Sequence, residues 1–309
     1  METIIIDDLK KMKAERYEKR LTKSNELSSN SLRTYASIVK KLYQEVFEGS
    51  GDLKPQLFID NLRKVVTALK DHPVNRRRNL YTALYSYTNY GPFQKLMLSD
   101  VKDYMGVMKD QEKSEKQKQN WVEFDEVKKK LKELKQRADF LYELKPDGDF
   151  TMDEFQTIQN YILLLLSSGI YFPTRRSKDW FDFKIKQIDL NEDNYLDGDK
   201  LVFNSYKNSL QKGEQTIKVN STVKKSLENW ISINPTKYLL FDKNEKQLTA
   251  VHITQRLNRI FGKKVSTTML RHIRTTNMFG GNVGLIKEME DEFKSMGSSI
   301  KMAHIYVKN

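Results

Sequence analysis

The sequence predicts a mainly α-helical protein that contains a small antiparallel β-sheet and divides into two domains. Apolar residues recur at helical spacing over most of the chain. In one stretch, residues 189–219, the spacing changes to the alternation typical of strands. The chain has 309 residues. That length supports two separate cores, because one domain usually takes roughly 100 to 200 residues.

Residues 26–110 are expected to form a small helical bundle. Its first helix, 28–47, follows Ser and Asn residues that suit an N-cap, and it places Leu32, Tyr35 and Leu42 near helical spacing. Similar patterns predict further helices at 55–69, 75–88 and 93–108.

The bundle is flanked by two segments of different character. Residues 1–25 are interpreted as an N-terminal extension, with one short apolar run followed by dense charge. Residues 111–120 are almost wholly charged or amide-bearing, which indicates an exposed linker or a helix extended into solvent.

A second domain is expected at residues 121–309. Two helices, 121–144 and 152–168, flank the turn-forming sequence LKPDGDF. A three-stranded antiparallel sheet should follow, because Asp197–Gly198 and residues 211–213 supply two turns between alternating segments. Helices are predicted to resume at 222–233, 251–261, 267–279 and 284–295.

The composition is strongly basic. Lysine and arginine number 54 against 41 acidic residues, which gives a formal net charge of +13. Such an excess attracts polyanions and makes their binding depend on salt. Nucleic acid is one such partner, but ribosome-associated, chromatin and anionic-membrane proteins have similar compositions. The absence of cysteine excludes disulfides, thiolate nucleophiles and cysteine-based zinc sites.

Several other function classes lack their sequence signals. The N-terminus has no apolar stretch of signal-peptide length, and the longest apolar run, 162–172, is shorter than the roughly 20 residues that span a bilayer. We therefore expect a soluble, intracellular protein. No P-loop, zinc-protease or dinucleotide motif is present, so neither a metal nor another cofactor is expected. The acidic groups Asp7–Asp8 and 290–292 are interpreted as solvated helix faces.

Basic residues in apolar surroundings are the best candidates for chemistry. Arg175 and Arg176 follow a helix that should be buried, and Asp179 comes shortly after them. A charge beside an apolar run is costly unless it is paired or bound to a ligand. The sequence leaves two roles open for an arginine here: pairing with Asp179 for packing, and binding an anion. Arg271 lies in apolar helical sequence and poses the same choice.

Other candidates are weaker on their own. Lys207 ends a predicted strand just before a turn, and Tyr306 lies near the end of the sequence. His272, beside Arg271, has either a capping or a packing role. Arg76, Arg77 and Arg78 open a helix of the bundle, where they form either a solvated run or contacts to phosphates.

In combination and order, these segments resemble the tyrosine recombinase (phage integrase) family. The first arginine box of that family is matched by RSKDWFDFKI, with Arg176 as the arginine and Asp179 as its supporting acid, which favours Arg176 over Arg175. The family lysine lies on a β-hairpin between two arginine boxes. Lys207 occupies that place, and Lys212 is the alternative.

The second and third boxes match with departures. TMLRH fits the second box, with Arg271 as the arginine and His272 as a supporting residue, but Thr268 stands where the family has histidine. MGSSIKMAHIY resembles the third box, with Ser298 in place of histidine or tryptophan and Tyr306 as the nucleophile. Thr268 and Ser298 are thus possible substitutes at the two histidine positions.

The resemblance implies a helical core-binding domain at 26–110, with Arg76, Arg77 and Arg78 as DNA contacts, followed by a recombinase catalytic domain at 121–309. It implies metal-independent cleavage and religation of double-stranded DNA through a 3′-phosphotyrosyl intermediate, for integration, excision or resolution. The expected assembly is a monomer when free and a homotetramer on paired DNA sites.

The segments PTRRSKDWFDFKI and TTMLRHIRTT are similar to those of recombinases from virophages, large DNA viruses and related mobile elements. The expected location is accordingly at DNA, in a host nucleus or a viral factory in the cytoplasm.

Two other readings stay open. The first is a degenerate recombinase that binds DNA but cleaves it poorly, because both family histidines are replaced. The second is a basic helical protein with structural or RNA-binding duties, although the sheet aromatics of an RNA-recognition motif are not evident.

Overall fold

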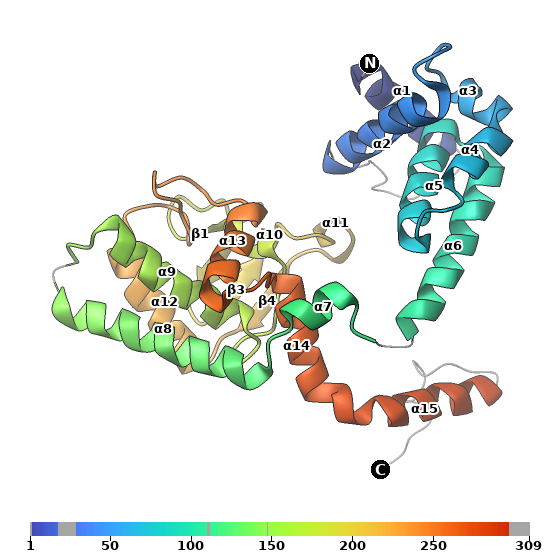
Figure 1. Cartoon of the computed structure of the whole chain (residues 1–309). Helices are drawn as coiled ribbons and strands as arrows, with labels where there is room; N and C mark the ends of the chain where they lie inside the picture. Colours follow the sequence, from blue (N-terminus) through green and yellow to red (C-terminus); the bar gives the residue numbers. More distant parts are fainter. Residues whose placement is uncertain (1, 18–28, 110–111, 147, 297–309) are drawn as a thin grey trace. The chain divides into compact units, whose positions relative to one another are not determined.

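The computed structural model describes residues 2–17, 29–109, 112–146 and 148–296. The chain forms two compact units, Met1–Glu112 and Lys113–Asn309, and each has its own apolar core (Figure 1). The fold is mainly helical with one small four-stranded sheet, as the sequence predicted in outline. No helix in the described ranges is long and apolar enough to cross a membrane.

Unit 1 is a helical bundle whose core is rich in aromatic side chains. Phe58 is fully buried and packs edge-on against Phe47 and Tyr87, with ring centroids 5.3 and 6.0 Å away. The helices of the unit are α1 (Glu2–Tyr17), α2 (Ser29–Phe47), α3 (Pro55–Asp60), α4 (Leu62–Leu69), α5 (Val74–Thr88) and α6 (Gly91–Lys109).

Two details of unit 1 differ from the sequence expectations. The single helix predicted at 55–69 is divided into α3 and α4 at Asn61, whose side chain donates a hydrogen bond to the carbonyl of Leu57 at 2.9 Å. The interpreted extension, 1–25, contains α1, whose Ile5 and Leu9 are fully buried in the unit 1 core. That helix is therefore part of the bundle.

Unit 2 packs helices around a central apolar helix. That helix, α9, buries nearly its whole length, because the run Tyr161–Leu166 leaves no polar face there. The helices of the unit are α7 (Glu115–Asn120), α8 (Phe124–Leu144), α9 (Met152–Ser167), α10 (Ser177–Phe181), α11 (Ser209–Lys212), α12 (Ser221–Ile233), α13 (Ala250–Phe261), α14 (Thr267–Phe279) and α15 (Val283–Ser295), with the 3₁₀ turn η1 (Gly280–Asn282).

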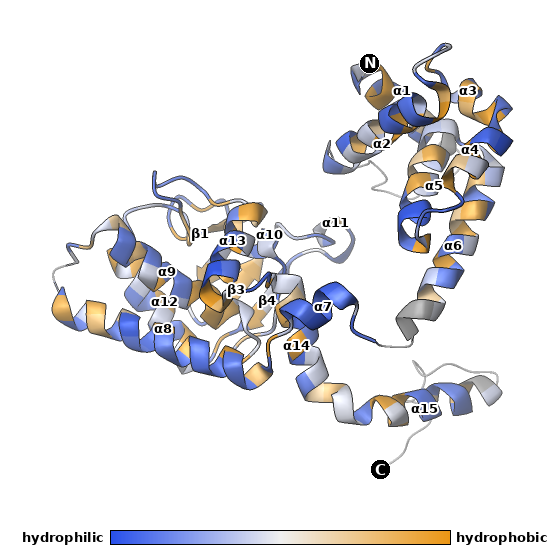
Figure 2. Ribbon diagram, in the orientation of Figure 1, coloured by the Kyte–Doolittle hydropathy of each residue, from blue (hydrophilic) through white to orange (hydrophobic). Residues whose placement is uncertain are grey.

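The expected linker, 111–120, includes a short helix that belongs to unit 2. Ser114 and Gln117 form a capping box that starts α7. At its other end, the Asn120 side chain accepts a hydrogen bond from the backbone N–H of Lys264 at 2.9 Å. The helix that follows, α8, is largely hydrophilic along its outer side in Figure 2.

The sheet corrects the prediction of three antiparallel strands. Its order is β1 (Phe183–Lys184), β2 (Asn194–Asp197), β3 (Lys200–Phe203) and β4 (Gln215–Lys218). β2, β3 and β4 are antiparallel as predicted, but β1 pairs with β2 in parallel. β1 has two residues and shows no alternation, so it carries no strand signal. Its Phe183 is held by packing on Trp180 and Phe203.

One turn was predicted correctly and one was not. Asp197–Gly198 joins β2 to β3, with Gly198 at φ 57°, a conformation that glycine adopts without strain. The second connection, between β3 and β4, is longer than a turn and contains α11. Tyr206 closes this loop by donating a hydrogen bond to the carbonyl of Gly213 at 2.7 Å.

The capping box of α9 gives a pH prediction. Hydrogen bonds from Lys145 and Thr151 lower the pKa of Glu154 to about 2, from 4.5. Because the folded pKa is depressed, this stabilisation is complete above pH 4.5 and is lost as the pH falls from there towards 2. Wild type should lose unit 2 stability over that window more steeply than Glu154→Gln.

The measurement is thermal unfolding against pH, followed by tryptophan fluorescence. All three tryptophans, Trp121, Trp180 and Trp230, lie in unit 2, so the signal reports that unit alone. Parallel curves for both proteins would contradict the prediction. Asp153→Asn, in the same helical turn, is the matched control, because Asp153 has no part in the capping box.

Candidate functional site

The two segments with candidate arginines meet at the N-terminal ends of α10 and α14. The Ser177 hydroxyl lies 3.0 Å from the hydroxyl of Thr267, so the first turns of the two helices are in contact. Thr267 is buried, and Ser266 caps α14 by accepting a hydrogen bond from the N–H of Met269. The structure thus brings together segments that are 90 residues apart.

Arg175 is a packing residue. Its side chain is 10% exposed, and its Nε donates to Asp179 Oδ2 at 2.7 Å. A second nitrogen, Nη1, donates to Gln215 Oε1 at 3.1 Å. The guanidinium also stacks over Phe203, 3.7 Å from the ring centroid, which is a favourable cation–π distance. These contacts tie α10 to β3 and β4.

Asp179 was expected to support Arg176, but its carboxylate pairs with Arg175. Arg176 is the N-cap residue of α10, and its side chain is exposed. Burial raises the pKa of Asp179, and the charge and hydrogen bond of Arg175, together with a smaller effect of Arg176, oppose that shift. The choice that the sequence left open therefore has a geometric answer: Arg175 takes the packing role, and Arg176 is left facing solvent.

Arg176 and Arg271 lie close enough for their charges to interact. Burial lowers the pKa of the partly buried Arg271, the charge of Arg176 lowers it further, and Asp179 acts in the opposite direction. Three arginines, Arg175, Arg176 and Arg271, thus share the single carboxylate of Asp179, which is hydrogen-bonded to Arg175, so the charge here is net positive. The pair Arg176 and Arg271 suits an anion with several oxygens, above all a phosphate.

The loop that carries Lys207 is fastened beside these arginines. The Asn194 side chain donates to the carbonyls of Asp179 and Ser205 at 3.1 and 2.8 Å, and it accepts from the N–H of Ser205 at 2.8 Å. Tyr206 lies 5.5 Å from the Arg175 guanidinium. The next residue, Lys207, is exposed. The alternative, Lys212, is exposed at the end of α11.

The remaining candidates for this site are Thr268, His272, Ser298 and Tyr306. Thr268 is exposed in the first turn of α14, three positions before Arg271, so the two lie on one side of the helix. His272 is also exposed. Tyr306 and Ser298 lie outside the described residues.

A pocket of about 510 Å³ adjoins Arg271. It lies between α14 and the loop that leads from α9 to the two arginines. Its lining residues are Gly169, Ile170, Tyr171, Phe172, Pro173, Thr174, Arg271, Arg274, Thr275 and Met278. Among these described residues there are two arginines and no acidic side chain.

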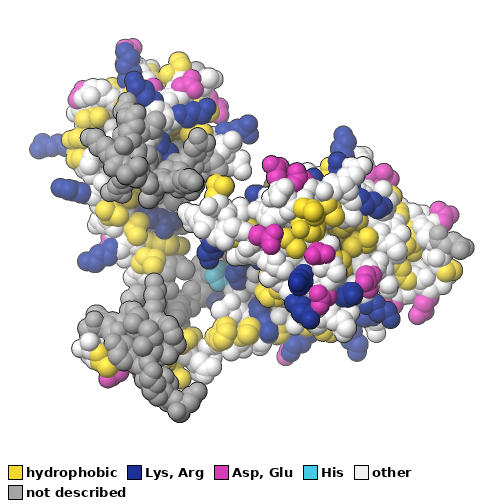
Figure 3. Space-filling view, turned by 180° about the vertical axis from the view of Figure 1, so that it is seen from behind, with side chains coloured by type: hydrophobic (Ala, Val, Ile, Leu, Met, Phe, Trp, Pro, Cys, Tyr) yellow, Lys and Arg dark blue, Asp and Glu magenta, His cyan; other side chains and the backbone are white. Residues whose placement is uncertain are grey.

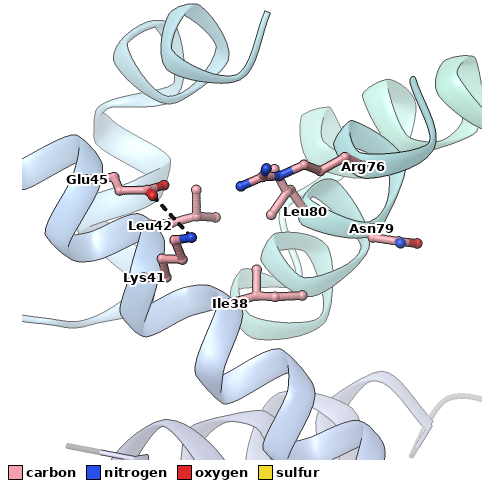
Figure 4. A pocket seen from close by; sticks show the side chains of 7 residues that line it. All are labelled: Ile38, Lys41, Leu42, Glu45, Arg76, Asn79 and Leu80. Atoms are coloured by element: carbon pink, nitrogen blue, oxygen red, sulfur yellow. Dashed lines mark ion pairs between the residues drawn. The ribbon is translucent and has the colours of Figure 1, made fainter. Parts of the chain in front are cut away.

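Arg76, Arg77 and Arg78, the candidate arginines of unit 1, have different surroundings. Arg77 donates to both oxygens of Asp100, with the shortest contact 2.6 Å, and Asp100 is buried, so this charge is neutralised. Arg78 lies 4.5 Å from the ring centroid of Tyr104. Arg76 is exposed beside a small pocket of about 230 Å³ between α2 and α5, across from the Lys41–Glu45 ion pair (Figure 4). The expectation of DNA contacts at Arg76, Arg77 and Arg78 stays a prediction, and the ion pair with Asp100 makes Arg77 the least available of the three.

Basic side chains are not confined to these places. On the face shown in Figure 3, Lys and Arg side chains lie on both units, interspersed with acidic ones. In the described ranges, no three His, Asp or Glu side chains are grouped so that they could hold a metal ion.

Sequence reasoning missed the residues that fasten the site. Asn194, Ser205 and Gln215 are ordinary polar residues in a strand or loop, and no local pattern distinguishes them. Arg274 was also missed, although its position three residues after Arg271 places both on one helix face.

Comparison with known proteins gives no further guidance. No protein-family model matches the sequence, and no curated protein matches it.

The different roles of Arg175 and Arg176 are testable by matched substitutions. Arg175→Gln leaves the Asp179 carboxylate buried without its partner, so it should cost about 3–5 kcal/mol of unit 2 stability. Arg176→Gln removes an exposed side chain and should change stability by less than about 0.5 kcal/mol. Tryptophan fluorescence during thermal or urea unfolding measures both. Equal losses would contradict the assignment.

Proposed function

We propose that this protein is a DNA strand transferase of the tyrosine recombinase type, which cuts and rejoins double-stranded DNA. The observation that carries the proposal is that Arg176 and Arg271 come from two helices whose first turns meet at Ser177 and Thr267, while Asp179 is hydrogen-bonded to Arg175. The sequence order of arginine, lysine, arginine and tyrosine supports the same conclusion, because it resembles the order in that family.

In the proposed reaction, the two arginines bind the non-bridging oxygens of the scissile phosphate and stabilise the charge that develops there. The phenolic oxygen of Tyr306 attacks phosphorus and forms the 3′-phosphotyrosyl bond, while the bond to the 5′-oxygen breaks. Lys207 donates a proton to that departing oxygen. A 5′-hydroxyl from a second duplex then reverses these steps and completes strand exchange without a metal or nucleotide cofactor.

Unit 1 is proposed to hold the duplex through its exposed basic residues. Arg76 carries this role best among Arg76, Arg77 and Arg78, because it is exposed, whereas Arg77 is paired with Asp100 and Arg78 is only partly exposed. Cleavage of two duplexes requires more than one active site, so the proposed working assembly is a homotetramer on paired sites. The free protein is proposed to be a monomer.

A degenerate recombinase that binds DNA without cleaving it is the second candidate. The observation that favours it is the exposed Thr268 in the place of a histidine. A hydroxyl is a poor proton acceptor at neutral pH, and Ser298 stands at the other histidine position, so neither of these two positions offers a base for the Tyr306 proton.

The nucleophile is tested with suicide substrates. Nicked or 5′-phosphorothiolate duplexes containing a verified target site should give a covalent protein–DNA adduct with wild type and none with Tyr306→Phe. The readout is a denaturing gel. Tight duplex binding without any adduct would overturn the strand-transfer proposal in favour of the degenerate protein.

The leaving-group acid is tested with the same substrates. Lys207→Ala should lose cleavage of ordinary duplexes but keep cleavage of the 5′-phosphorothiolate, because a thiolate leaves without needing a proton. Lys212→Ala is the matched control from the same loop and should cleave both. The reverse pattern would give the acid role to Lys212.

Arg76 and Arg77 are expected to affect different properties, Arg76 the binding of duplex DNA and Arg77 the stability of unit 1. Arg76→Gln should weaken duplex binding and lower the slope of log K against log salt by about 0.9, the loss of one phosphate contact, without changing stability. Arg77→Gln should destabilise unit 1, because Asp100 loses its partner. Duplex titration at several salt concentrations and circular dichroism on heating measure the two effects. An unchanged salt slope for Arg76→Gln would remove that residue from the interface.

A further inference from the structure

Arg274 is a second arginine of the α14 pocket, and the proposed reaction gives it no role. Its stem crosses Gly169 so closely that a Cβ atom there would lie 2.6 Å from Arg274 Cγ. Gly169 has φ +80°, which an L side chain rarely adopts. The backbone at position 169 thus leaves room for the Arg274 stem on this side of α14.

The charged end of Arg274 is also positioned. Its guanidinium carbon lies 5.1 Å from the ring centroid of Phe124, at the start of α8. Phe124 is buried, so its ring is a fixed surface. A cation–π contact holds a guanidinium without neutralising it, whereas the Asp179 carboxylate offsets the charge of Arg175. Arg274 therefore keeps its charge available.

The pocket chemistry matches a nucleotide chain. Arg271 and Arg274 are three residues apart on one helix, which places their Cβ atoms about 5–6 Å from each other. Consecutive phosphates of a DNA strand rise about 3.4 Å along the axis and are also rotated around it, so their direct separation is larger than that rise. Two long basic side chains whose Cβ atoms are about 5–6 Å apart can therefore each take one of two consecutive phosphates. Tyr171 and Met278 add apolar wall for a sugar or base, and the described lining has no carboxylate that would repel the anion.

We infer that the α14 pocket binds two neighbouring phosphates of one DNA strand. Arg271 takes the phosphate to be cleaved, and Arg274 takes the adjoining one. The second contact fixes the direction in which the strand runs through the site. This inference rests on the proposed function, because it assigns Arg271 to the scissile phosphate.

The test compares a nucleoside with two phosphates to nucleosides with one. Thymidine 3′,5′-bisphosphate carries its phosphates as they follow each other along a strand. Wild type should bind it roughly tenfold more tightly than either thymidine monophosphate, since a second charge-assisted contact is made. Arg274→Gln should bind all three alike. Calorimetry or NMR titration of the full chain measures these affinities.

Two further variants sharpen the assignment. Arg137→Gln is the matched control, because Arg137 is exposed on α8 about 20 Å along the helix from Phe124 and should leave the preference unchanged. Gly169→Ala displaces the Arg274 stem and should lose the preference as Arg274→Gln does. Arg274→Gln removes a partly exposed side chain, so unfolding followed by tryptophan fluorescence should show an intact unit 2.

Duplex binding separates this inference from the proposed function. For a random duplex, Arg274→Gln should lower the slope of log K against log salt by about 0.9. Wild type that binds duplex but shows no preference for the bisphosphate, or Arg274→Gln that keeps the preference, overturns the inference alone. Wild type that binds no duplex overturns the proposed function, and the inference with it.

Discussion

The candidate site depends on the buried ion pair between Arg175 and Asp179. A buried pair is costly to desolvate and contributes little net stability, but removing one partner is severe. Here the pair has a positional consequence. Because Arg175 is drawn inward onto Asp179, Gln215 and the Phe203 ring, it fixes α10 against the sheet. The next residue, Arg176, then has to face outward. The buried, paired Arg175 thus positions Arg176, whose charge is exposed to solvent.

The rest of the site is held by polar contacts between segments far apart in sequence. Ser177 meets Thr267 and brings α14 beside α10. Asn194 joins the backbone of α10 to the loop after β3, which carries Lys207. These contacts are buried or partly buried, where hydrogen bonds are costly to break. Rigid attachment of this kind suits phosphoryl transfer, in which catalysis consists largely of positioning and charge stabilisation.

The same principle separates the arginines of unit 1. Arg77 is paired with a buried carboxylate and contributes to the bundle, whereas Arg76 is exposed at the edge of the pocket between α2 and α5 (Figure 4). A high content of basic residues therefore overstates the charge available to a polyanion. The arginines proposed to meet phosphate are the exposed Arg76 and Arg176, together with Arg271 and Arg274 beside their pocket.

The sequence by itself determined the helical fold class, two regions with separate cores, the three antiparallel strands and the set of basic residues worth testing, because periodicity, turns and charge are local properties. Only the tertiary structure decided which member of Arg175–Arg176 is inward, that Arg77 is paired with Asp100, that β1 joins the sheet and that Gly169 makes room for Arg274. Each of these depends on a partner that packing brings close from elsewhere in the chain or, at Arg175, on the direction in which packing turns a side chain. Local patterns carry no information about either.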